Sequence, residues 1–311
     1  MDKSHMDVSS NAARAALSEI ADLAAPFTGR HAGDGNGRRL TNESQACSIK
    51  MLPARLHERA AVFARDVNPV NFPLHLGAIG IEPQRLTLMT TKYWGARGRH
   101  LTVSFLESPP ADLRKRIVQH LNAWSRCASF SFTETSDVGD VRISLGEGGY
   151  WSFLGTDIKL VPPSQQTMNL EGFTMDTPDS EFRRVVRHEA GHTLGFPHEH
   201  MRQEIVQRID PERAYDYFWR TQGWDRATVD QQVLTPLDNT SILGTPADQD
   251  SIMCYQLPGE ITRDGQPIRG GVDINETDCV FAGKVYPKVG AVARQAAEAE
   301  WDPSEDVLLP A

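Results

Sequence analysis

Apolar and polar residues alternate over residues 100–106, where the sequence reads HLTVSFL. Shorter runs of similar texture occur at 129–134, 140–145, 157–161 and 167–173. A period of two places successive side chains on opposite faces of an extended chain. Each of these segments is therefore predicted to form a β-strand.

Apolar residues spaced three and four apart indicate helices elsewhere in the chain. Residues 108–127 carry a clear apolar stripe. A second helix is predicted at 177–195, with Thr177 as its N-cap, Pro178 in its first turn and Gly195 at its end. Further helices are expected at 11–27, 53–67 and 210–221, and the sequence from there to residue 287 reads as mostly loop.

The mixture of strands and helices predicts an α+β fold, and its distribution divides the 311 residues into three parts. Residues 1–90 are interpreted as an N-terminal segment, either a prosegment or a helical extension. Residues 91–288 form the main domain. Residues 289–311 form an acidic C-terminal tail.

The net charge of −9 and the absence of a basic stripe make nucleic acid an unsuitable partner. No apolar run in the sequence approaches the roughly 18 residues of a membrane-spanning helix, so no membrane partner is expected. The N-terminus does not read as a secretory signal, which leaves cytoplasmic localisation and export by a non-classical route both open. We expect a monomer.

The stretch RHEAGHTLGFPHEHMR, residues 187–202, holds four of the ten histidines. His188 and His192 are four residues apart, so they lie one turn apart on the same face of a helix and can bind one cation. Glu189 projects to one side, where it can act as a general base. Gly195 can adopt the left-handed conformation that returns His198 to the same cation. Three imidazoles with one open position predict a catalytic Zn²⁺ site.

This HExxHxxGxxH pattern resembles that of the metzincin metalloproteases, with Met253 in SIMCY at the place of their Met-turn. Phe196, Glu199 and Arg202 extend the likeness to the astacins. The resemblance implies a catalytic domain of two subdomains, with a twisted mixed sheet and helices above the cleft and a loop-rich lower part. It also implies that Tyr255 ligates zinc, swings away and stabilises the oxyanion.

Some positions depart from the astacin pattern. Cys127 matches one half-cystine, whereas Cys279 lies close to the place of its partner, and the pairing is left open. Two cysteines expected in the family are replaced by Tyr150 and Leu170, so the second bridge should be missing. Asp34 or Cys47 could cap the zinc in a latent form, although ordinary loop positions are the alternative for both.

The resemblance implies a zinc-dependent endopeptidase that acts on protein or peptide substrates. Zinc would be held by His188, His192 and His198, and Glu189 and Tyr255 would serve the reaction. The substrate is expected to add itself as a strand along residues 157–161. The alternatives are a zinc-stabilised peptide-binding or toxin-like module without turnover, and a zinc hydrolase acting on non-peptide amides.

Overall fold

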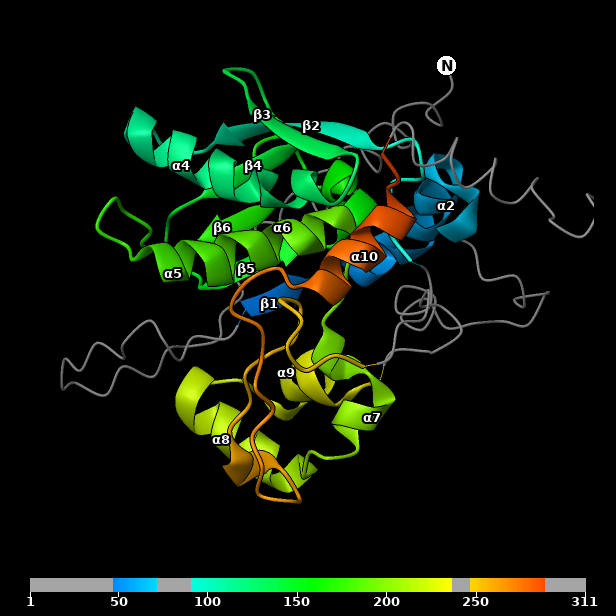
Figure 1. Cartoon of the computed structure of the whole chain (residues 1–311), viewed down its shortest axis with the longest axis vertical. Coiled ribbons are helices and arrows are strands. Elements are labelled where there is room, and N and C mark those ends of the chain that lie inside the picture. The colour runs from blue at the N-terminus through cyan, green and yellow to red at the C-terminus, as the bar shows by residue number, and fades with distance from the viewer. Residues whose placement is uncertain (1–46, 72–90, 237–246, 289–311) are drawn as a thin grey trace, which may run out of the picture.

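A computed structural model describes residues 47–71, 91–236 and 247–288 (Figure 1). The helix predicted at 11–27, the tail at 289–311 and Asp34 lie outside these ranges. The sheet and several helices form an upper part, and the remaining helices with long connecting loops form a lower part (Figure 1). Among the described residues, no helix has the length and apolar character needed to cross a membrane.

A six-stranded mixed sheet forms the centre of the upper part, in the order β1-β5-β6-β4-β2-β3. Strand β1 runs parallel to β5, and β5 runs antiparallel to β6, whereas the other pairs are parallel. The strands are β1 (Cys47–Lys50), β2 (Arg99–Phe105), β3 (Phe130–Glu134), β4 (Val141–Ser144), β5 (Tyr150–Phe153) and β6 (Met168–Leu170).

Strands β2, β3, β4 and β6 confirm four of the predicted segments, with shorter ends in most cases. Strands β1 and β5 were not predicted. All four residues of β5 are buried, so its sequence shows no alternation between apolar and polar positions. Strand β1 (CSIK) alternates buried and half-buried positions in the structure.

The strand predicted at 157–161 is wrong, because this stretch lies largely in a 3₁₀-helix, η5 (Gly155–Leu160). Gly155 begins the helix with a left-handed φ of 47°. The side chain of Asp157 turns inward to pair with Lys92, with 3.3 Å between Oδ1 and Nζ. Pro162 and Pro163 follow, and proline cannot donate to a sheet ladder. The edges of the sheet are β1 and β3, and β1 pairs along β5.

Helices α2 (His57–Val67) and α4 (Ala111–Leu121) confirm the cores of two predicted helices, and α4 continues as the 3₁₀-helix η4 (Asn122–Arg126). The helix predicted at 177–195 is also present. It comprises α5 (Asp179–Glu181), the π-helix η6 (Phe182–Val186) and α6 (Arg187–Leu194), and Pro178 rather than Thr177 stands at its N-cap.

The lower part contains α7 (Gln203–Val206), α8 (Pro211–Gln222), α9 (Arg226–Val229) and the π-helix η8 (Asp230–Leu234). Helix α8 matches the prediction at 210–221, and Asp210 caps its start by accepting a hydrogen bond from Arg213 N. The prediction of mostly loop up to residue 287 is wrong in part, because α9, η8 and α10 interrupt it.

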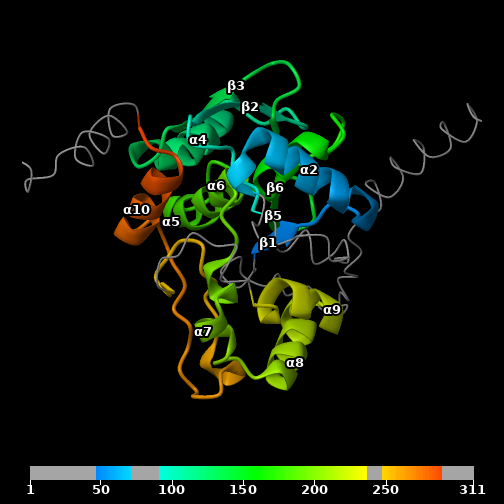
Figure 2. The same ribbon diagram turned by 90° about the vertical axis from the view of Figure 1, so that its right-hand side faces the viewer.

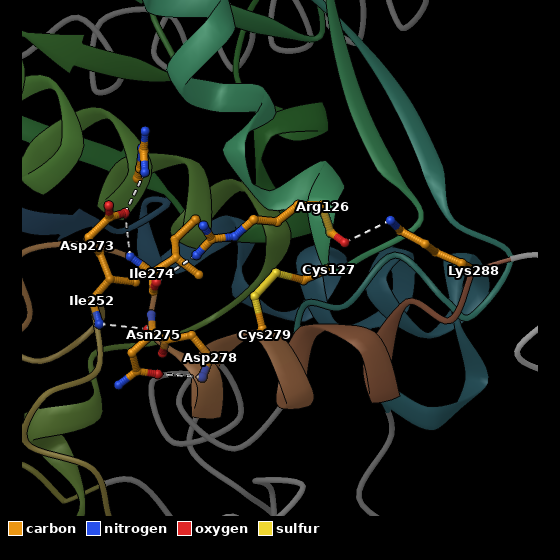
Figure 3. Close-up of a disulfide and its surroundings, with 10 residues drawn as sticks. Arg126, Cys127, Ile252, Asp273, Ile274, Asn275, Asp278, Cys279 and Lys288 are labelled. Carbon is orange, nitrogen blue, oxygen red and sulfur yellow. Dashed lines mark hydrogen bonds and ion pairs between the residues drawn. A yellow bond between two sulfur atoms is a disulfide. The ribbon is translucent and has the colours of Figure 1, made fainter.

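Helix α10 (Glu276–Val285) returns the chain to the upper part (Figure 2). Its start is a capping box, in which Asn275 and Asp278 each bond the other's backbone N–H. A disulfide joins Cys279 of this helix to Cys127, just beyond η4 (Figure 3). The two cysteines are 152 positions apart in the sequence. The pairing that the sequence left open is therefore Cys127 with Cys279.

Candidate metal centre

Helix α6 brings His188 and His192 together as the i, i+4 spacing predicts, with ring centroids 4.6 Å apart. The helix ends at Gly195, which has a left-handed φ of 99°. A side chain at this position would be strained and would meet Lys92 O and Tyr93 Cδ1 at 3.0 Å. The turn at this glycine carries His198 back, and its ring centroid lies 4.6 Å from that of His192.

The tautomers of two histidines follow from their partners. Nδ1 of His188 bonds the carbonyl of Ile252 at 2.6 Å, and Nδ1 of His192 bonds the carbonyl of Phe196 at 2.8 Å. Because a carbonyl only accepts, both Nδ1 atoms carry the hydrogen and donate. Each Nε2 then presents a lone pair, which is the arrangement that orients a metal ligand.

The donor atoms of His188, His192 and His198 converge, all within 4.8 Å of one another. Nε2 of His192 and Nε2 of His198 are 3.0 Å apart. Two nitrogens on one tetrahedral zinc at about 2.05 Å would be separated by about 3.3 Å. His188 Nε2 is buried without a hydrogen-bond partner in the described part of the chain. Converging lone pairs and an unsatisfied buried nitrogen fit a zinc ion held by these three residues.

Burial keeps these imidazoles neutral, as metal binding requires. It lowers the pKa of His188 to about 4 and holds the pKa values of His192 and His198 well below their usual range. The exposed fractions of these side chains are 3%, 0% and 0%. Neutral imidazoles therefore offer their nitrogens over the whole neutral range.

Glu189 lies on α6 between the two helical ligands and is fully buried. Neither of its carboxylate oxygens has a hydrogen-bond partner among the residues that the structure describes. Burial raises the pKa of Glu189 to about 8. A buried carboxyl group without partners is costly unless a ligand or a reaction uses it.

Tyr255 approaches the same centre from the segment after α9 and η8. Its ring lies 4.2 Å from the ring of His198, and its hydroxyl is another buried group without a partner in the described ranges. On its other side the ring of His200 stacks at 4.2 Å with 15° between planes. The sequence left His200 outside the ligand set. In the structure His200 is completely buried, with its ring against that of Tyr255.

Met253 lies in a tight turn in which Cys254 N bonds Ser251 O at 2.9 Å. The sulfur of Met253 would be 2.3 Å from a Cβ atom added at Gly191, so only glycine lets α6 approach the turn so closely. Glu199 anchors the same turn, because its N–H bonds Met253 O at 2.8 Å. Asp278 of α10 accepts bonds from the Ser251 hydroxyl and Ile252 N.

Cys47, at the start of β1, also reaches the metal centre. Its sulfur lies within 4.8 Å of a donor atom of His188 and of Glu189. The side chain is 3% exposed, and burial raises the pKa of the thiol. Of the two residues that the sequence suggested as zinc caps, Cys47 is therefore at the site.

Comparison with known proteins agrees with this geometry. The family model for astacin (Peptidase family M12A) matches residues 89–263. Zinc metalloproteinase nas-27 from Caenorhabditis elegans is 37% identical over 107 residues, which are 34% of this chain and 23% of that protein. Zinc metalloproteinase nas-7 from the same animal is 32% identical over 29% of this chain and 21% of that protein. The chain thus spans less than a quarter of the length of these relatives.

The structure of myroilysin is similar over 64% of this chain and 96% of that chain, with 29% sequence identity and a TM-score of 0.59. This likeness and the family match confirm the predicted α+β fold of the metzincin type. The chain therefore belongs to the astacin family, Peptidase family M12A, whose members are zinc metallopeptidases.

Proposed function

We propose that this protein is a zinc-dependent endopeptidase that hydrolyses peptide bonds in protein or peptide substrates. The observation that carries the proposal is the convergence of three neutral imidazoles beside a buried, unpartnered carboxyl group. His188, His192 and His198 would hold the zinc, and Glu189 would stand next to the reacting atoms.

Bound zinc would supply Lewis acidity, which polarises a carbonyl group and lowers the pKa of water toward about 7. Glu189 would accept the proton of the attacking water and pass it to the leaving amine. The unpartnered hydroxyl of Tyr255 would donate to the oxygen that becomes negative in the transition state.

Glu189→Ala tests the general base in a chain that also carries Cys47→Ser, so that the blocking by β1 proposed below does not mask hydrolysis. We expect at least a hundredfold loss of hydrolysis of unfolded casein, since a general base contributes about 10²–10⁴-fold. Zinc content should be retained, because the three histidines remain. Glu204→Ala, which changes an exposed glutamate of α7, is the matched control and should keep full activity. Chelation should abolish hydrolysis, and equal activity of the Glu189→Ala and control proteins would refute the assignment.

The second candidate, a zinc-stabilised module that binds peptides without turnover, predicts a different outcome. Peptide would bind to the zinc-loaded protein, but no variant, including those with the cleft opened as described next, would release cleavage products. The buried Glu189 favours the enzyme, because a binding module gains nothing from an unpartnered carboxyl group.

The N-terminal strand suggests that this form of the protein is latent. Strand β1 covers the edge of β5, where an extended substrate would add itself to the sheet. Its first residue, Cys47, places a sulfur beside His188 and Glu189. We propose that β1 blocks the cleft and that the Cys47 thiolate takes the open position on the zinc.

Cys47→Ser tests latency in the full chain. The weaker zinc ligand should loosen β1, and hydrolysis of casein should rise about tenfold or more relative to the wild type. Cys254→Ser is the matched control, because Cys254 is the other buried free cysteine in the described ranges. Equal hydrolysis by the wild type and Cys47→Ser would show that Cys47 does not restrain the site.

A further inference from the structure

The side-chain amide of Gln232 makes both of its hydrogen bonds to the backbone of one residue in β1. Ile49 N donates to Gln232 Oε1 at 3.1 Å, and Gln232 Nε2 donates to Ile49 O at 3.0 Å. The two residues are 183 positions apart in the sequence. Gln232 is 3% exposed and lies in the π-helix η8 of the lower part.

This pair of bonds serves the open edge of β1. In an extended chain the N–H and C=O of one residue point to the same side, and neighbouring residues point to opposite sides. Since Ile49 turns both groups to Gln232, its neighbours Ser48 and Lys50 turn theirs to β5. Strand β1 is therefore held from two sides, by β5 above and by one glutamine below. Figure 1 shows β1 between the two parts of the molecule.

Gln232 is connected to the metal centre through His200. Its backbone oxygen accepts a hydrogen bond of 2.9 Å from His200 Nε2. The ring of His200 stacks on Tyr255, whose hydroxyl lies at the site. The backbone of Gln232 is therefore held beside Tyr255, and its side-chain amide extends from there to β1.

We propose that Gln232 makes the same pair of hydrogen bonds to the backbone of a peptide substrate in the cleft as it makes to Ile49 in the structure. The inference rests on the proposed endopeptidase function. Both contacts are to main-chain atoms, so they would accept any substrate sequence except proline at the donating residue. When β1 leaves, the side-chain amide faces the vacated cleft, where the N–H and C=O of a peptide residue can replace those of Ile49.

The register of β1 places the contact within the substrate. Ile49 is the second residue after Cys47, which lies at the metal centre. A substrate in the same place would have the residue bonded by Gln232 about two positions from the residue at the metal, at the spacing of an extended chain. Gln232 is thus a positioning residue for the peptide main chain, opposite β5.

Backbone-substituted peptides give the decisive experiment. A series of peptides is made in which each amide N–H in turn is replaced by an ester oxygen. Dissociation constants are measured on the full chain carrying Cys47→Ala and Glu189→Ala, with and without Gln232→Ala. The ester-to-amide ratio is taken within one protein, so competition from β1 cancels.

With Gln232 present, the ester at one position near the metal should weaken binding about five- to tenfold more than the esters at positions that face β5. In the Gln232→Ala protein this one penalty should disappear, and the others should remain. Gln231→Ala, which changes the preceding glutamine, is the control and should keep the full pattern. An unchanged pattern in Gln232→Ala would overturn the proposal, because a merely structural glutamine would not remove a single ester penalty.

This readout separates two failures. Binding is measured on a protein that lacks Glu189, so the ester pattern does not depend on hydrolysis. Absence of hydrolysis by the Cys47→Ala chain would count against the proposed endopeptidase function alone. Labelling of Cys47 by a thiol reagent in the otherwise wild-type chain adds a check on β1. Gln232→Ala should speed the reaction several-fold, and an unchanged rate would show that the observed contact does not hold β1.

Discussion

His200 differs from its three neighbouring histidines in what it contacts. It stacks on Tyr255 and donates to the carbonyl of Gln232, and it lies within the same short motif as the proposed zinc ligands. Spacing predicted the three proposed ligands, because the i, i+4 relation and the glycine turn act over a few residues. Spacing could not show that the partners of His200 lie far along the chain, in η8 and beside Met253.

At the residue scale, His200→Ala should lower stability by about 2–4 kcal/mol, since a buried ring and its hydrogen bond are lost together. His200→Phe keeps the stack and leaves the Gln232 carbonyl without its donor, so its cost should be about 1–3 kcal/mol. Urea denaturation measures both. Zinc content should stay near that of the wild type in the Phe variant, and a loss of zinc there would make His200 a ligand after all.

At the scale of elements, the metal centre depends on how α6 ends. Gly195→Ala puts a side chain at a φ of 99° and within 3.0 Å of Lys92 O. We expect a loss of about 1–3 kcal/mol in stability from the strained backbone. Zinc affinity should also fall, because His198 follows this turn, and competition with a chelator measures it. Gly172→Ala, also at a positive φ but with open space around it, controls for strain alone and should leave zinc affinity unchanged.

The sequence predicted those elements whose pattern is local. Four strands were found from the alternation of apolar and polar residues, and the helix through α6 was found from its start at Thr177 and Pro178 and its end at Gly195. Strand β1 was not predicted, because this short strand is defined by its pairing with β5, which lies some hundred residues later in the sequence. The strand at 157–161 was wrong because a buried Lys92–Asp157 pair and two following prolines outweigh apparent alternation.

At the scale of the whole molecule, the Cys127–Cys279 disulfide connects to the metal centre through α10. Asp278 beside Cys279 accepts a hydrogen bond from Ile252 N (Figure 3). The carbonyl of Ile252 in turn orients His188. Cys127→Ala/Cys279→Ala should lower the free energy of unfolding by about 3–5 kcal/mol, given the long loop that the bridge closes. Denaturant titration of the zinc-free proteins tests this expectation, and a loss below 1 kcal/mol would contradict it.

Strand β1 is a peptide ligand that belongs to the same chain as its receptor. Such a ligand competes at an effective concentration that is roughly millimolar for a short flexible connection. Under the proposed latency, a free substrate at lower concentration would seldom displace it, however good its sequence. One cut between β1 and α2 would turn this intramolecular competitor into a dilute one. Activation would then follow from the fall in the effective concentration of β1, without any change in the metal centre itself.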